Sequence, residues 1–144
     1  MPLLPTLLLT AWCAALSWFD LRERRLPNAL TLTGAVAVLI YAISRDESAT
    51  AVTGGLLLAA PYLTVHLGNP NALGAGDVKL ALGLGASTAL AGPEAWTTAA
   101  LTAPLLTATA GLGTVLARVT PGRKTLPHGP AMCVASLVAL LATR

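Results

Sequence analysis

The sequence predicts an all-α polytopic membrane protein, with about six transmembrane helices in one domain over residues 1–144. Of its residues, 55% are hydrophobic and only 10% are charged, and the mean hydropathy is +0.72. Soluble domains carry roughly 25% charged residues, so this composition cannot make an ordinary aqueous surface. The apolar residues form six runs, and the charges lie almost entirely between them. This pattern is expected because a charge at mid-bilayer costs a few kcal/mol or more.

The first three runs cover residues 2–19, 29–44 and 49–67. A spanning helix needs roughly 20 apolar residues, or fewer when flanking side chains reach the interface. A basic cluster follows the first run rather than preceding it, so we expect a retained helix and not a cleaved signal. Before the second run, Pro27 is expected to stop the preceding helix, and Asn28 can cap the next one. A short charged loop separates the second run from the third.

The last three runs cover residues 78–91, 95–117 and 130–142, of which the first and third are short. The last run starts at Pro130, a residue that suits the first turn of a helix. Small residues are frequent within the runs, and they allow helices to approach closely in lipid. We interpret the following glycines as packing positions: Gly54, Gly55, Gly83, Gly85, Gly111 and Gly113.

The distribution of basic residues predicts the orientation in the cytoplasmic (inner) membrane. The first, third and fifth connections hold seven basic residues: Arg22, Arg24, Arg25, Lys79, Arg118, Arg123 and Lys124. The opposite side has only Arg45 and Arg144. The positive-inside rule therefore places the odd connections in the cytoplasm and both termini outside. The net charge of +3 is too small and too scattered to indicate nucleic-acid binding.

Six carboxylates are the main candidates for chemistry. Three of them are expected to be solvated residues of external turns: Asp46, Glu47 and Glu94. Glu23 lies among three arginines, whose charge we expect it to balance. Asp20 and Asp77 remain, and both are predicted to lie on the cytoplasmic side.

Asp77 lies in the segment Gly74-Ala75-Gly76-Asp77-Val78-Lys79-Leu80, between two apolar runs. Glycines here are expected to let the chain turn with positive φ and to let another backbone come close. An ionisable side chain beside such a break indicates a functional site. The alternative is a simple helix N-cap. Lys79 should point away from Asp77 on a helix, and we expect it to anchor at lipid headgroups, with contact to the aspartates or substrate as the lesser option.

Asp20 ends the first run, and its non-functional alternative is a surface ion pair with Arg24, four residues on. A helical bundle could bring Asp20 and Asp77 together at the cytoplasmic face. Two carboxyls that share a site hold one proton between them. The ionised carboxyl can then deprotonate a water molecule while the protonated one polarises a scissile carbonyl. This chemistry requires no metal or other cofactor.

Other constellations are weaker. His66 and His128 are far apart in the sequence and lack the H-E-x-x-H spacing of a zinc site. Cys13 and Cys133 both lie within apolar runs, so neither a disulfide framework nor a thiolate metal cluster is indicated.

Three motifs resemble those of the type IV prepilin peptidases, a family of polytopic intramembrane aspartic proteases. They are Asp20 with Arg25-Leu26-Pro27-Asn28, then Gly74-x-Gly76-Asp77-x-Lys79-Leu80, and finally Leu126-Pro127-His128-Gly129-Pro130-Ala131. The motifs occur in the family's order, and the similarity covers nearly the whole chain. The resemblance implies that Asp20 and Asp77 are the catalytic aspartates. The supporting motif residues are Pro27, Asn28, Gly74, Gly76, Lys79, Gly129 and Pro130.

The resemblance also implies a substrate. This would be the basic leader of a type IV prepilin, pseudopilin or Tad/Flp-type pilin, cut at the cytoplasmic face, with membrane lipid as the other partner. Longer members have an N-terminal region with paired cysteines, associated with methylation of the new pilin N-terminus. This sequence begins with its first apolar run, so we expect the short form, with peptidase activity and without that region. His128 stands where the family usually has an aromatic residue.

Two alternatives from other functional classes remain open. The protein could be a small transporter or channel subunit whose acidic residues bind a cation or relay protons. It could also be an inactive assembly factor that keeps the fold, although the intact pair of aspartates counts against this reading.

Overall fold

The computed structural model describes residues 3–116 and 128–143, and within them every regular element is a helix. The helices are α1 (Leu3–Glu23), α2 (Asn28–Ile43), α3 (Ser48–Gly68), α4 (Ala75–Ala89), α5 (Pro93–Leu116) and α6 (Gly129–Ala142). The all-α prediction is confirmed, and each predicted run corresponds to one helix. The predicted end of the fifth run at residue 117 lies outside the described residues.

The outer surface of the bundle fits a membrane location. By length and composition, α1 and α3 are able to cross a bilayer, whereas α2 and α6 are apolar but shorter. Large apolar side chains point outward along the helices, and Leu7, Val36, Leu56 and Leu101 are 54–72% exposed. A contiguous apolar exterior is unusual for a soluble protein, whereas lipid-facing helices require one.

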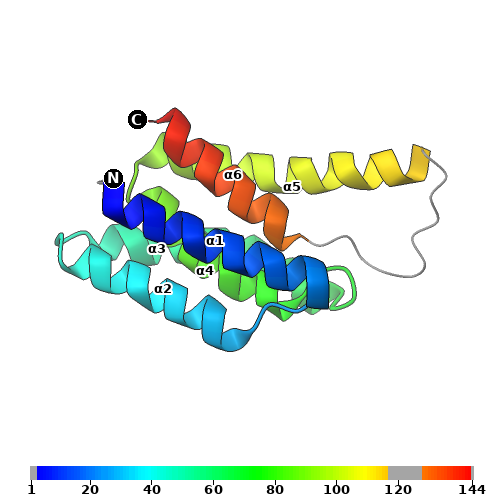
Figure 1. Cartoon of the computed structure of the whole chain (residues 1–144), viewed down its shortest axis with the longest axis horizontal. Helices are drawn as coiled ribbons and strands as arrows, with labels where there is room; N and C mark the ends of the chain where they lie inside the picture. The colour runs from blue at the N-terminus through cyan, green and yellow to red at the C-terminus, as the bar shows by residue number, and fades with distance from the viewer. Residues whose placement is uncertain (1–2, 117–127, 144) are drawn as a thin grey trace.

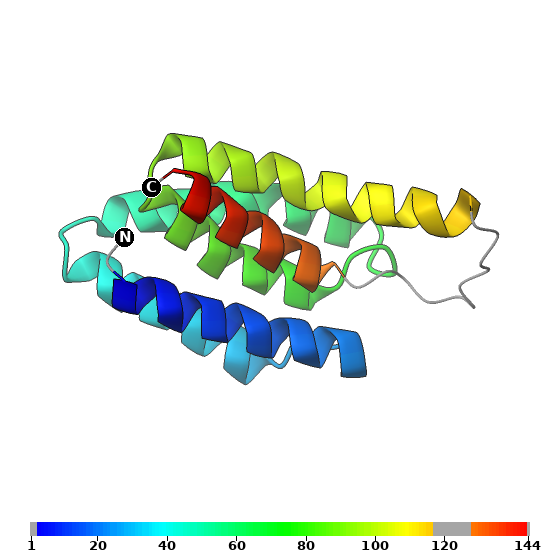
Figure 2. The same cartoon turned by 45° about the horizontal axis from the view of Figure 1, so that its top comes forward.

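Helix α4 lies at the centre of the bundle. It packs against α2, α3, α5 and α6, and α1 lies against α6 and α2 (Figures 1 and 2). The core between these helices contains fully buried side chains from α1, α4 and α6: Leu16, Leu80, Leu84 and Met132. Helix α5 lies beside α6 and extends past the rest of the bundle (Figure 1).

The crossing of α3 and α4 depends on glycines. A Cβ atom on Gly85 would lie 2.6 Å from the carbonyl oxygen of Gly54, and one on Gly55 would lie 2.7 Å from that of Leu82. Such distances leave no space for a side chain, so the packing interpretation is confirmed there and at Gly83, which packs under a tryptophan ring. It is wrong for Gly113, where an added Cβ would meet open space.

The turn between α1 and α2 differs from the prediction. Helix α1 ends at Glu23, and Arg24 takes a left-handed φ of 52°, so Pro27 is not what stops the helix. Pro27 instead stands at the N-cap of α2 in an extended conformation, where its missing N–H is no loss. Asn28 is already the first helical residue, past the capping position. Its side chain therefore does not cap α2 and is free to reach another helix.

The start of α4 also corrects the prediction. Gly74 has a φ of −73°, and Gly76 already lies within the helix, so neither glycine uses positive φ. A Cβ on Gly76 would lie 2.9 Å from the Cβ of Leu26, so this glycine gives space to a side chain and not to the predicted second backbone. Asp77 lies in the first turn of α4 rather than before it.

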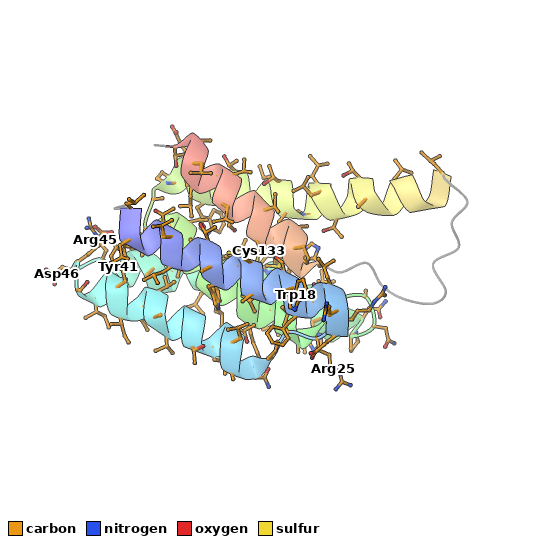
Figure 3. All side chains as sticks on the ribbon, in the orientation of Figure 1. Trp18, Arg25, Tyr41, Arg45, Asp46 and Cys133 are labelled. Atoms are coloured by element: carbon orange, nitrogen blue, oxygen red, sulfur yellow. The ribbon has the colours of Figure 1, made fainter. Side chains whose placement is uncertain are left out.

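The bundle has two distinct ends. The start of α1, the end of α6 and the loop that carries Arg45 and Asp46 lie at one end (Figures 1 and 3). The other end, where α1 finishes and α4 and α6 begin, carries Arg25. We call the latter the aspartate end, because Asp20 and Asp77 lie there.

Candidate active site

Asp20 lies in the last turn of α1 and is buried, with 7% of its surface exposed. Its Oδ2 accepts a hydrogen bond of 3.0 Å from the backbone N–H of Gly129, the first residue of α6. The free amides at a helix start favour a negative charge. The alternative of a surface ion pair does not describe this buried carboxyl, although Arg24 is close enough for its positive charge to act on it.

Asp77 is the third residue of α4 and is 9% exposed. Its Oδ2 accepts a hydrogen bond of 3.2 Å from the backbone N–H of Gly74. The N-cap alternative is therefore right in part, because this carboxyl binds an otherwise free amide at the helix start. That bond occupies one of the two carboxyl oxygens.

The structure brings the two aspartates into one site. The charge of Asp20 acts on the Asp77 carboxyl, and the charges of both act on the thiol of Cys133, one turn into α6. Within the described residues, hydrogen bonds engage Oδ2 of each aspartate, which leaves each Oδ1 for water, a proton or substrate. Adjacent carboxyls do not both ionise readily, so the pair is suited to hold a single proton.

The supporting motif residues make different contacts around the two aspartates. Lys79 donates a hydrogen bond of 2.7 Å from Nζ to Oδ1 of Asn28, which ties α4 to the start of α2. The sequence did not predict this protein partner for Lys79. A Cβ on Gly129 would lie 2.7 Å from Oδ2 of Asp20, so only glycine fits beside that carboxyl. Pro130 lies in the first turn of α6, as predicted.

A polar cluster beside the site was missed from the sequence. His128, at the N-cap of α6, contacts Thr107 of α5 through Nδ1 at 2.5 Å and the hydroxyl of Tyr62 on α3 through Nε2 at 3.2 Å. Burial lowers the pKa of the His128 imidazole below its ordinary value, which favours the neutral ring. These partners are 21 and 66 residues away in the sequence. The only available signal was the position of His128 in the late motif.

The two cysteines form the side of the site toward the bundle interior. Cys13 of α1 and Cys133 of α6 are free thiols, each 1% exposed, and they lie close enough to each other to interact. Their proximity was not predicted, because they are far apart in the sequence.

The chain is similar to known proteins over nearly its whole length. A sequence profile of the type IV leader peptidase family matches residues 7–118, which include both aspartates. A prepilin leader peptidase/N-methyltransferase from Aeromonas salmonicida (strain A449) is 34% identical over 145 residues, covering 96% of this chain and 49% of the relative. One from Aeromonas hydrophila is 32% identical with the same coverage. The chain thus spans about half the length of these relatives. No solved structure matches it significantly.

Proposed function

The chain belongs to the type IV leader peptidase family, and on this premise we propose that it is an intramembrane aspartic endopeptidase. It removes the basic leader peptide of type IV prepilins or prepilin-like proteins at the cytoplasmic face of the membrane. One observation carries the proposal: Asp20 and Asp77, on separate helices, are both buried at the same end of the bundle and interact with each other.

The shared proton allows the pair to act as base and acid in one cycle. The ionised aspartate takes a proton from water, the resulting hydroxide adds to the scissile carbonyl carbon, and the protonated aspartate gives its proton to the carbonyl oxygen. The tetrahedral intermediate then collapses: the first aspartate passes its proton to the leaving nitrogen, and the second regains a proton from the intermediate's hydroxyl. No covalent enzyme adduct is formed.

The charge distribution supports cleavage at the cytoplasmic face. Four basic residues belong to the described part of the aspartate end: Arg22, Arg24, Arg25 and Lys79. The opposite end has Arg45, which is paired with Glu47 at 3.3 Å. By the positive-inside rule, the aspartate end faces the cytoplasm. The negative pair attracts a basic leader there, while the apolar part of the substrate stays in the bilayer.

The experiment is co-expression with a type IV prepilin that carries a basic leader, followed by gel analysis of the size shift on cleavage. Asp20→Asn and Asp77→Asn keep the size of each side chain but remove the titrating carboxyl, so each is expected to abolish cleavage. Asp46→Asn is the matched control, because Asp46 lies at the opposite end with a left-handed φ of 58° that asparagine tolerates.

Substantial processing by either active-site variant, at wild-type levels in the membrane, would overturn the assignment of the pair. A proton or cation flux that depends on these carboxyls, with no cleavage of any prepilin by the wild type, would support the transporter alternative.

A further inference from the structure

Two hydrogen bonds in series lead from the end of α3 to Asp77 through one peptide group. His66, in the last turn of α3, contacts the carbonyl oxygen of Leu73 through Nδ1 at 2.8 Å. The backbone N–H of Gly74 donates to Oδ2 of Asp77 at 3.2 Å. The carbonyl of Leu73 and the N–H of Gly74 belong to the same planar peptide unit. His66 is therefore connected to the carboxyl of Asp77 by this single rigid group.

The chemistry of the groups fixes the direction of both hydrogen bonds. A carbonyl oxygen only accepts, so Nδ1 of His66 must carry the hydrogen that it shares with Leu73. Both the neutral ring with its hydrogen on Nδ1 and the imidazolium supply that hydrogen, so the bond does not require His66 to change its charge. A backbone N–H only donates, so Oδ2 of Asp77 is the acceptor. A donor aimed at a carboxyl oxygen favours the ionised carboxyl.

The Leu73–Gly74 peptide needs such an anchor because Gly74 restricts it little. Glycine has no Cβ and tolerates a wide range of backbone angles. Even a Cβ added at Gly74 would come no closer than 3.5 Å to its nearest neighbour, Oδ2 of Asp77, so side-chain packing does not hold this residue in place. A rotation of the peptide would turn the N–H away from Asp77. The hydrogen bond from His66 opposes that rotation, because in a planar peptide the direction of the C=O sets the direction of the N–H.

The other hydrogen bonds of the connection between α3 and α4 lie earlier in it. The N–H of Asn71 donates to Oδ1 of Asn69 at 3.2 Å, and the N–H of Ala72 donates to the backbone oxygen of Asn69 at 3.0 Å. These bonds stabilise the first part of the connection and do not involve the Leu73–Gly74 peptide. His66 and Asn69 thus act on different parts of the same segment.

Building on the proposed function, we propose that His66 is a positioning residue that holds the Leu73–Gly74 peptide with its N–H directed at Asp77. Hydrogen bonds in series polarise one another, so the bond from His66 also makes the Gly74 N–H a stronger donor. Oδ2 of Asp77 is held in place, and Oδ1 is left for the proton, water or substrate. His66 acts on the reaction only through this peptide.

The test measures kcat, KM and the pH profile of prepilin cleavage by purified enzyme in detergent micelles. The titratable or charged groups around Asp77 are Asp20 from α1, Tyr62 from α3, Lys79 from α4 and Cys133 from α6. The ionisable residues of α2 and α5 lie at the opposite end of the bundle: Tyr41 and Glu94. The variants below keep all of these groups, so a shift of the pH profile reports on the amide that binds Asp77.

His66→Phe removes the donor and keeps a ring. We expect kcat to fall about three- to tenfold, as for one lost hydrogen bond of ordinary strength, with KM nearly unchanged. Asp77 ionises less readily when its amide donor is held less firmly. Both limbs of the kcat profile should therefore move to higher pH by about half a unit. A role in folding alone would lower the amount of active enzyme and leave the limbs where they are.

His66→Asn is the rescue variant. The amide nitrogen of asparagine is attached to Cγ, as Nδ1 is in histidine, so it can donate to Leu73 from the same place. It should restore most of kcat and the wild-type pH profile. Asn69→Ala is the matched control, because it weakens the same connection without touching the Leu73–Gly74 peptide, and it should leave both quantities near those of the wild type.

A wild-type kcat and pH profile in His66→Phe would overturn the inference. An equal defect in His66→Asn, or the same shift of the limbs in Asn69→Ala, would also overturn it, because general loosening of the connection would then be the cause. If His66→Phe fails to fold, His66→Leu removes the same donor and decides instead. These outcomes are distinct from failure of the proposed function, in which the wild-type enzyme itself would not cleave or Asp77→Asn would remain active.

Discussion

At the scale of single residues, the backbone amides of Gly74 and Gly129 each bind one aspartate, but the space beside these two glycines differs. A Cβ on Gly129 would lie 2.7 Å from Asp20, whereas one on Gly74 would lie 3.5 Å from Asp77, an ordinary contact. Gly74 also has a negative φ that other residues adopt. Steric space therefore requires glycine only at position 129, beside the carboxyl of α1.

His128 makes the stability of the site depend on pH. Burial lowers its pKa in the folded state, so the folded protein resists protonation that the unfolded chain accepts. The stability is fully present above the ordinary histidine pKa and is lost as pH falls toward the lowered value. We expect the melting temperature of the wild type in detergent to drop by a few degrees more than that of His128→Gln between pH 7 and pH 5. Equal drops in the two proteins would contradict this.

At the scale of helices, close backbone approach and indole hydrogen bonds hold the bundle together. The Trp96 indole N–H of α5 donates to the Gly54 carbonyl of α3 at 2.9 Å, and that of Trp12 on α1 donates to Leu30 of α2 at 2.8 Å. Because lipid provides no hydrophobic drive for helices to associate, small residues and hydrogen bonds of this kind carry the packing. The crossing of α3 and α4 thus fixes where Tyr62 and Asp77 lie relative to each other.

This crossing is testable with two alanine substitutions. Gly85→Ala places a methyl group 2.6 Å from a carbonyl oxygen, so it should destabilise the protein by about 1–3 kcal/mol, as overpacking does in other cores. Gly113→Ala meets open space and should be neutral or stabilising by up to about 1 kcal/mol, from helix propensity alone. Thermal unfolding in detergent measures both, and equal effects would refute the packing role of Gly85.

At the scale of the whole molecule, the site occupies one end of an apolar bundle. The start of α1 and the end of α6 lie at the opposite end, together with the exposed Arg45–Glu47 pair (Figure 3). The carboxyls therefore lie at the end of the bundle away from both ends of the described chain. A protease for a cytoplasmic leader requires the aspartate end to face the cytoplasm.

Reporter fusions to the end of the chain test the six-span topology. With the C-terminus outside, a fused alkaline phosphatase should be active and a fused green fluorescent protein should be dark. The same reporters fused after Arg25, at the aspartate end, should give the reverse result. A fluorescent C-terminal fusion would mean that the number of spans or the orientation is wrong.

The sequence alone determined the six helices. The length of each apolar run and the positions of the charges between runs are local properties, and they decide directly whether a segment is stable in lipid. It also singled out Asp20 and Asp77, since carboxyls at the ends of apolar runs are costly without a role. Only the tertiary structure decided that Gly129 holds Asp20, that Lys79 reaches Asn28, and that His128 meets Tyr62. Those contacts depend on which helix faces meet. Close packing between segments that are far apart in the chain decides this, and no local sequence pattern predicts such packing.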